Sequence, residues 1–313
     1  LDLVTGPAGL ALSDTLRALA GAEVSRGTQV IVWDVRLPVA CMALLVGAAL
    51  ALAGAEMQTV LENPLAEPFT LGVSSAAALG AAVAIILGLT IPGLPGVWSV
   101  SANAFLFAVG ALLLLQLLGR IRGGGPEVLV LFGVALNFTA GALLSLVQFV
   151  ASADALQQLV FWSMGSLASA QWPGVAMIGV ILLAAAPFSF AAAWKLTALR
   201  LGEDQARSFG VDVTRLRRWT LLRVSLLSAA AVSMVGVIGF VGLAGPHIAR
   251  MLVGENHRVF LPASLLTGAL VMSLASTLSK TVVPGVLLPV GLVTSLIGLP
   301  IFFALILRGR RRG

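Results

Sequence analysis

Charged side chains, cysteine and histidine are scarce in this sequence, and each scarcity narrows the class of protein. Charged residues make up 10% of the 313 residues and hydrophobic residues 59%, whereas a soluble domain has about 25% charged residues. A single cysteine, Cys41, excludes an intrachain disulfide. The histidines have no neighbours at metal-ligand spacing, no nucleophile constellation is recognisable, and the phosphate-binding pattern Gly-x-x-x-x-Gly-Lys-Ser/Thr does not occur. We therefore predict a membrane protein that is not an enzyme and that itself binds no metal, cofactor or ATP.

Long hydrophobic runs dominate what is present. A membrane-spanning helix needs about 20 mostly apolar residues, and candidate spans occur at residues 37–60, 70–89, 100–118, 128–150, 172–194, 219–238, 239–253, 260–279 and 287–307. The run at 239–253 is short and broken by glycine and proline, so we expect a short or tilted helix there. Pro289 and Pro300 predict that the last run is kinked or split.

These runs predict an all-α fold, a polytopic transmembrane helical bundle of about nine helices. We expect one transmembrane domain over residues 1–313. Residues 1–35 are too polar to span a membrane and are expected to form an extracytoplasmic N-terminal segment. Because this segment begins without Met, we expect a further helix to precede it.

The basic residues lie between the apolar runs and mostly on one side. If successive loops alternate sides, one face holds all of the 19 Lys and Arg residues except Arg17, Arg26, Arg36 and Lys280. Positive charge is enriched on the cytoplasmic side of membrane proteins, so the C-terminus and the polar insertion 195–218 are predicted to be cytoplasmic. A membrane face thus accounts for the net charge of +6, and we expect no nucleic-acid partner.

A proline-rich turn separates the first two runs. The segment Glu62-Asn63-Pro64-Leu65-Ala66-Glu67-Pro68 contains two prolines, each of which fixes a backbone dihedral and removes an N–H donor. We expect a rigid turn rather than a flexible loop. From the residues alone, a functional turn and a plain connection between helices remain equally compatible with the pattern.

The polar insertion contains a short amphipathic segment. Residues 199–211 predict a helix with Leu201, Ala206 and Phe209 on one side, ended by Gly210 as a C-cap. An apolar helix face outside the bilayer needs a partner, so we expect a cytoplasmic protein to dock there. The alternative is a helix that lies on the lipid headgroups.

Short motifs follow one another in a fixed order along residues 32–307. They include Arg36-Leu37-Pro38, Asn63-Pro64-Leu65-Ala66, Leu71-Gly72-Val73-Ser74, Trp162-Ser163-Met164-Gly165, Leu201-Gly202-Glu203, Gly239-Phe240-Val241-Gly242-Leu243, Pro246-His247 and Leu288-Pro289-Val290-Gly291. In this order they resemble the permease family of ATP-binding-cassette (ABC) importers for vitamin B12, ferric siderophores and haem. The chain departs from the family pattern at three positions, where arginine, aspartate and arginine respectively are common: Val39, Ser276 and Lys280.

The resemblance implies a bundle of about ten helices per subunit that works as a dimer, with a second permease copy as the expected partner. It also implies two cytoplasmic ATPase subunits, which use ATP and Mg²⁺, and a periplasmic substrate-binding protein. By resemblance, ATPase coupling falls on Leu199, Leu201, Gly202, Glu203, Ala206, Arg207, Phe209 and Gly210. The cytoplasmic gate falls on Asn63, Pro64, Leu65, Gly125 and Pro126, and binding-protein docking falls on Arg36 and Lys280.

The expected function is therefore import of an iron chelate, haem or a ferric siderophore, from the periplasm to the cytoplasm. The expected location is the bacterial inner membrane, with lipid around a multi-pass chain. Cobalamin is the alternative cargo in the same family. The alternative class is an ion-coupled secondary transporter, which usually needs ionisable residues deep in its helices; such residues are almost absent here, Glu56 being the exception.

Overall fold

The part of the chain that the structure describes is helical, and no strand occurs within it, which confirms the predicted fold class. The structure is a computed structural model and describes residues 2–6, 9–121, 125–283 and 285–309. The helices are α1 (Leu12–Leu19), α2 (Arg26–Val30), η1 (Ile31–Arg36), α3 (Leu37–Val60), η2 (Pro68–Leu71), α4 (Val73–Ile85), α5 (Gly96–Ile121), α6 (Pro126–Phe149), α7 (Ala153–Ser163), α8 (Trp172–Ala191), α9 (Ala193–Leu199), α10 (Glu203–Ser208), α11 (Val213–Val235), α12 (Val241–Val253), α13 (His257–Thr281) and α14 (Val290–Gly309).

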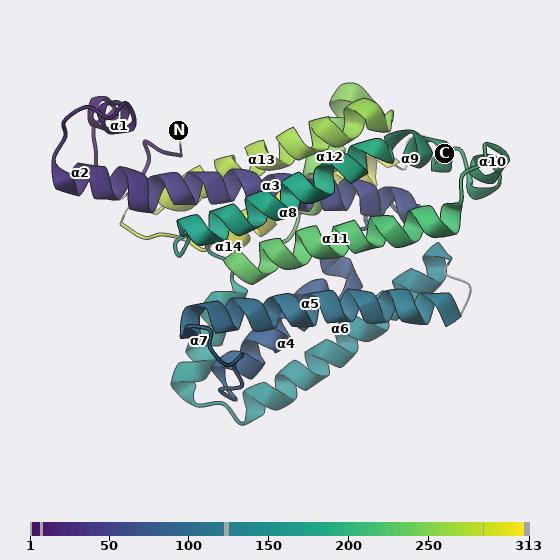
Figure 1. Ribbon diagram of the computed structural model, residues 1–313, viewed down its shortest axis with the longest axis horizontal. Helices are drawn as coiled ribbons and strands as arrows, with labels where there is room; N and C mark the ends of the chain where they lie inside the picture. The colour runs from purple at the N-terminus through teal and green to yellow at the C-terminus, as the bar shows by residue number, and fades with distance from the viewer. Residues whose placement is uncertain (1, 7–8, 122–124, 284, 310–313) are drawn as a thin grey trace.

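The helices form two groups that lie side by side (Figure 1). The larger group is built around α3, which contacts α8, α11, α12 and α13. In the smaller group, α4 contacts α5, α6 and α7. Because α11 contacts α3 and α8 as well as α4 and α5, it joins the two groups. The short helix α10 lies at one end of the bundle, and α1 and α2 lie at the other (Figure 1).

Each of the predicted apolar runs contains a helix. Within the described residues, six helices are long and apolar enough to cross a membrane: Arg26–Val60, Trp98–Gly119, Pro126–Phe149, Trp172–Ala191, Val213–Val235 and His257–Thr281. Shorter apolar helices occupy the remaining runs, at Val73–Ile85, Val241–Val253 and Val290–Pro300. The short helix expected near residues 239–253 is thereby confirmed.

The predicted span 70–89 is too long. The helix in this run, α4, has 13 residues and is about 20 Å long, whereas the hydrocarbon core of a bilayer is about 30 Å thick. The apolar residues after Ile85 form turns instead, and Gly88 takes a φ of 65° there. A short helix is tolerated because α5, α6, α7 and α11 surround it.

The structure adds three details that the sequence does not indicate. Residues 26–36 of the predicted N-terminal segment are helical and continue into α3. α7 was not predicted, because its 11 residues mix polar and apolar side chains and are too few to span. α14 passes through Pro300 without interruption, so the last helix is not split there.

Small residues let α3 sit at the centre of the larger group. Nearly every residue of α3 is buried, and its glycines touch neighbouring backbone directly. A Cβ atom on Gly54 would lie 1.8 Å from the carbonyl oxygen of Gly242 in α12, and one on Gly47 would lie 2.3 Å from that of Gly268 in α13. Only glycine permits these approaches, which are typical of packed membrane helices.

Candidate functional site

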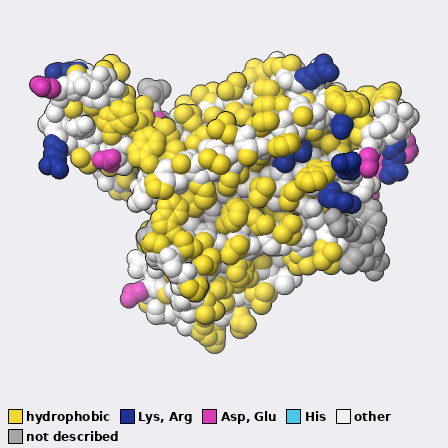
Figure 2. Space-filling model, in the orientation of Figure 1, with side chains coloured by type: hydrophobic (Ala, Val, Ile, Leu, Met, Phe, Trp, Pro, Cys, Tyr) yellow, Lys and Arg dark blue, Asp and Glu magenta, His cyan; other side chains and the backbone are white. Residues whose placement is uncertain are grey.

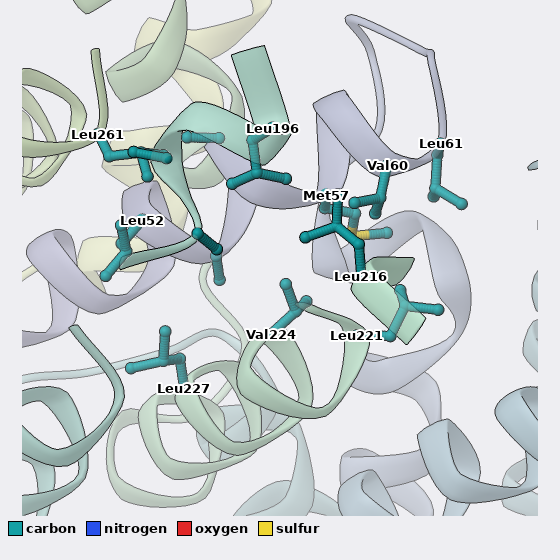
Figure 3. Packing of buried hydrophobic residues seen from close by; sticks show 14 of the residues in the cluster. Leu52, Met57, Val60, Leu61, Leu196, Leu216, Leu221, Val224, Leu227 and Leu261 are labelled. Atoms are coloured by element: carbon teal, nitrogen blue, oxygen red, sulfur yellow. The ribbon is translucent and has the colours of Figure 1, made fainter. Parts of the chain in front are cut away.

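The predicted coupling segment, residues 199–211, is anchored to the rest of the bundle through α9. Leu196 and Leu199 of α9 are almost completely buried. Figure 3 shows Leu196 in one hydrophobic cluster with side chains of α3, α11 and α13, among them Met57, Leu216 and Leu261. The segment therefore begins at a helix, α9, that is packed firmly into the bundle, and α10 follows α9 in the chain.

Glycines bound α10 on both sides. Gly202, before the helix, has a φ of 112°, and Gly210, after it, has a φ of 79°; a side chain would be strained in either conformation. The amide of Gly210 donates to the Arg207 carbonyl and that of Val211 to the Ala206 carbonyl, which satisfies the end of the helix. The helix ends just before Gly210, as predicted. It covers only Glu203–Ser208, however, and not the whole predicted range 199–211, because Gly202 leaves the helical conformation and separates Leu201 from α10.

The apolar side chains of the segment divide between two faces. Leu201 and Phe209 are 59% and 58% exposed, whereas Ala206 is fully buried. The prediction that Ala206 shares an exposed face with Leu201 and Phe209 is therefore wrong, because its side of α10 faces the bundle. Two large apolar side chains remain open to a partner or a lipid surface.

Ion pairs hold the first residue of α10. Glu203 accepts a hydrogen bond of 2.6 Å from Arg207 one turn later and another of 3.3 Å from Arg217 of α11. The hydrogen bond from Arg207, together with the charge of Arg217, lowers the pKa of the Glu203 carboxyl below its usual range. Arg217 is almost fully buried, so this pair fixes α10 against α11.

Two hydrogen bonds hold the predicted gate turn. The side chain of Asn63 accepts a hydrogen bond of 2.9 Å from the backbone amide of Leu65, and the Asn63 amide donates to the carbonyl of Gln58 at 3.1 Å. Leu65 remains partly exposed. Glu62, just before the turn, has a φ of 50°, an uncommon conformation for a residue with a side chain.

The second part of the predicted gate begins α6. Gly125 is the N-cap of α6 and Pro126 is its first residue, a position that suits proline because no N–H is needed there. α6 contacts η2, which follows the Asn63–Leu65 turn in the chain. This contact involves Gly133 and Asn137, at least two turns into α6 from Gly125.

The two predicted docking cations lie together at the opposite end, but neither is freely exposed. Arg36 donates to the carbonyls of Leu3 and Val4, at 3.0 Å each. The ammonium group of Lys280 lies 2.7 Å from a carboxylate oxygen of Asp2. Residues 2–4 therefore cover both cations, and the docking role of Arg36 and Lys280 stays a prediction.

Asp2 supplies the carboxylate that the family pattern places in α13. The hydroxyl of Ser276, which stands where aspartate is common, donates to Asp2 at 2.8 Å. Arg36, Ser276 and Lys280 also line one cavity of about 190 Å³. Among the described residues, Nη2 of Arg36 and Oδ2 of Asp2 are buried and have no hydrogen-bond partner.

A buried ion pair crosses the larger group where the sequence indicated only an isolated carboxylate. Glu56 of α3 is fully buried and accepts hydrogen bonds from Arg223 of α11, the shortest of 2.6 Å. Arg223 also donates to Thr220 at 3.0 Å. Arg223, one of the basic residues predicted for the inner face, thus links two helices.

Sequence reasoning missed Arg217, Asp2 and Arg223 as partners of predicted residues. A signal existed for Arg217, since it falls on the buried face of α11 between Leu216 and Thr220. A charge on an otherwise apolar stripe indicates a buried partner. No comparable signal pointed to Asp2, whose partner Lys280 is 278 positions away.

Comparisons with known proteins agree with this arrangement of helices. Residues 1–308 match the FecCD transport family. The chain belongs to the FecCD transport family. It is accordingly the permease subunit of an ABC importer, embedded in a membrane, and permeases of this family work with ATPase subunits and a substrate-binding protein.

Similar proteins cover nearly the whole FecCD chain. The haemin transport system permease HmuU of Yersinia pestis is 37% identical, over 99% of this chain and 93% of its own. The vitamin B12 import permease BtuC of Klebsiella pneumoniae is 36% identical, over 94% and 87% respectively. A solved inward-facing structure described as a metal-chelate type ABC transporter is 32% identical, with a TM-score of 0.83 over 95% of this chain and 96% of that one.

Charged side chains are unevenly distributed over the face shown in Figure 2. Figure 2 shows Lys and Arg side chains gathered near the α10 end of the visible face, whereas the middle of that face is largely hydrophobic. In the ranges that the structure describes, no three His, Cys, Asp or Glu residues are grouped as a metal site. Arg122 and the arginines at 310–312, which entered the predicted charge distribution, lie outside those ranges.

Proposed function

We propose that this FecCD permease imports an iron chelate, haem or a ferric siderophore, and that residues 199–211 form the contact with its ATPase. The observation that carries the coupling role is the geometry of α10. Leu201 and Phe209 project from a segment that buried leucines and the Glu203–Arg217 ion pair hold rigidly. A rigid projection with an apolar tip can transmit force from a partner, whereas a loosely attached helix on the headgroups could not.

The orientation follows from the distribution of charge. Lys195, Arg200, Arg207, Arg215 and Arg218 all lie on or next to α9, α10 and the start of α11. By the positive-inside rule this end faces the cytoplasm. The proposed complex then has two copies of the permease, two ATPase subunits on the α10 side and a binding protein on the other, in the inner membrane with the C-terminus inside.

Transport in this proposal needs no covalent chemistry from the permease. ATP and Mg²⁺ bind the partner subunits, and their closure moves the two α10 helices. The turn at Asn63–Leu65 narrows the cytoplasmic end of the pathway between the copies and opens when the outer end closes. The permease itself contributes a pathway, not a cofactor or a catalytic group.

Docking of the binding protein would use Arg36 and Lys280. Because residues 2–4 now occupy these cations, a docking carboxylate would have to exchange with Asp2 and with the backbone carbonyls. The buried Nη2 of Arg36 favours such an exchange, since an unsatisfied guanidinium nitrogen is costly.

The cargo assignment rests on the relatives. The haemin permease favours an iron chelate, whereas the metal-chelate type structure fits both an iron chelate and cobalamin, which is a cobalt chelate. Cobalamin is the second candidate, because the vitamin B12 permease is similar to nearly the same degree. Uptake of haemin, ferrichrome and cobalamin by cells that carry the complete transporter in place of their own would separate the candidates. Uptake of cobalamin alone would overturn the iron-chelate assignment.

Co-purification with the ATPase subunit tests the coupling role. We expect the unsubstituted chain to retain the ATPase in detergent and a Glu203→Arg, Phe209→Asp double variant to lose it while remaining monodisperse. The matched control is Asp204→Arg with Phe161→Asp, which likewise replaces one acidic residue by arginine and one phenylalanine by aspartate but leaves Phe209 and the Glu203 ion pairs intact. Retention of the ATPase by the double variant would contradict the role of α10.

A further inference from the structure

Two lines of polar contacts lead from the coupling segment to the gate turn of the same subunit. The first runs through Arg217 of α11. Its Nη2 lies 3.3 Å from Glu203 of α10 and 3.7 Å from Glu62, and its Nε donates to the carbonyl of Val60 at 3.0 Å. Val60 ends α3, and Glu62 directly precedes Asn63. One buried guanidinium thus binds the coupling helix and the beginning of the turn together.

The second line starts at Arg200, which ends α9. Arg200 is hydrogen-bonded to Glu255, and Glu255 is also paired with Arg250 of α12, whose Nε lies 3.4 Å away. Nη2 of Arg250 donates to the side chain of Gln58 at 3.0 Å. The backbone carbonyl of Gln58 accepts the amide of Asn63 at 3.1 Å.

Both lines therefore end at residues 58–63, the approach to the gate turn. Their inner members are buried, with Gln58 1% and Arg217 6% exposed. Breaking either contact would leave a buried polar group without its partner, which is costly. The contacts are therefore expected to persist when α10 moves, and a contiguous network of this kind can carry energetic coupling between two sites.

A third set of contacts joins α9 to two neighbouring helices. The ring of His257, at the start of α13, lies between two hydroxyls: Nε2 is 2.7 Å from Thr59 of α3 and Nδ1 is 3.3 Å from Thr197 of α9. These contacts join α3, α9 and α13 into one body. Movement of α10 is then passed to the end of α3 rather than absorbed within α9.

We propose that Arg217, Gln58 and Arg250 are positioning residues that transmit the movement of α10 to the Asn63–Leu65 turn. The inference rests on the proposed coupling role of α10 and adds the route by which coupling reaches the gate. Arg217 provides the shorter route, since a single side chain spans it. Loss of this side chain should uncouple the gate from ATP while the ATPase remains bound.

The test measures thiol labelling at the gate, which requires no knowledge of the cargo. Leu65→Cys is introduced in a Cys41→Ala background, since Cys41 is the chain's one cysteine. The permease–ATPase complex is placed in nanodiscs, and the maleimide labelling rate of the permease is measured without nucleotide and with ATP, Mg²⁺ and vanadate. ATP hydrolysis and retention of the ATPase are recorded on the same samples.

In the background chain we expect ATP to change the labelling rate by about fivefold or more, within the usual range of allosteric coupling. Arg217→Met should abolish most of this change while the complex still hydrolyses ATP. Arg218→Met is the matched control, because Arg218 is exposed and adjacent, and it should respond like the background. Arg217→Lys keeps the charge but loses the fork of donors and should retain a partial response.

Each failure has a distinct meaning. If the background chain retains no ATPase, or its labelling ignores ATP, the proposed coupling role itself fails. If Arg217→Met responds as fully as the control, the route through Arg217 is refuted. If Arg217→Met does not assemble with the ATPase, Arg217→Lys and Gln58→Leu take its place. A reduced change in labelling rate in either variant supports the proposal, and a full change in both overturns it.

Discussion

Buried cations occur at both ends of the bundle. Their partners come from several helices at one end and from one short segment at the other. At the α10 end, Arg217 and Arg250 are bound by groups from different helices, including Glu203 and Gln58. At the other end, Arg36 and Lys280 are bound by a single short segment, residues 2–4. The first arrangement ties several helices together, whereas the second can be released by moving one segment.

This difference matches the partners proposed for each end. An end that receives force from an ATPase needs contacts that survive movement, and cross-helix ion pairs with buried members provide them. An end that docks and releases a binding protein needs cations whose present partners can be exchanged. The unpartnered Nη2 shows that Arg36 is incompletely satisfied, whereas Arg217 meets oxygen atoms of Val60, Glu62 and Glu203.

The largest expected effect comes from breaking a cross-helix pair. Glu56→Ala leaves Arg223 buried without its carboxylate, and we expect the free energy of unfolding to fall by about 3–5 kcal/mol. Denaturant titration of the purified protein in detergent measures this loss. Glu23→Ala, an exposed change, is the control and should cost little. A Glu56→Met, Arg223→Met variant should recover most of the stability; equal loss in the single and double variants would contradict a specific pair.

A smaller effect is expected at the outer end, where the substitution should strengthen binding of the partner rather than weaken the protein. Asp2→Asn removes the carboxylate that holds Lys280, so the affinity of the permease for its binding protein should rise, by several-fold up to about tenfold. Surface-immobilised binding protein and permease nanodiscs give the dissociation constant. Asp34→Asn, an exposed change two positions from Arg36 in sequence, should leave the dissociation constant unchanged. A fall in affinity would show that Asp2 positions Lys280 for docking instead of competing for it.

The smallest effect concerns pH at the α10 end. Hydrogen bonds from Arg207 and Arg200 respectively lower the pKa of Glu203 and Glu255. A carboxyl whose pKa is lower in the folded state stabilises that state when the pH is above the ordinary carboxyl pKa of about 4.3. This stabilisation is lost as the pH falls through the lowered pKa. Melting of the permease–ATPase complex should thus be unchanged by these groups from pH 8 to pH 5. A clear loss already at pH 6 that Glu203→Gln abolishes would contradict the lowered pKa.

Much of the fold could be predicted from the sequence, because a long apolar run indicates a helix that is buried in lipid or in protein. Each predicted run contains a helix, including the short one at α12. The prediction failed at α4 because apolar content does not distinguish a helix from the apolar turns that follow Ile85. It failed at α7 because a short helix outside the runs carries no length signal.

The candidate site was predictable where a single segment carries it and unpredictable where distant segments meet. The turn at Asn63–Leu65 and the end of α10 at Gly210 follow from local backbone preferences. The pairing of Lys280 with Asp2 depends on tertiary contact across almost the whole chain. The burial of Ala206 likewise depends on which side of α10 meets the bundle, and a helical period alone does not fix that choice.

Energy-dependent uptake tests the central claim most directly. Proteoliposomes would contain the permease and its ATPase, with the binding protein and haemin carrying radioactive iron outside and ATP inside. We predict accumulation of labelled haemin that requires the ATPase, the binding protein and ATP together, and that the Glu203→Arg, Phe209→Asp variant abolishes. Accumulation by the permease alone, driven by a proton or sodium gradient, would contradict the account and identify a secondary transporter.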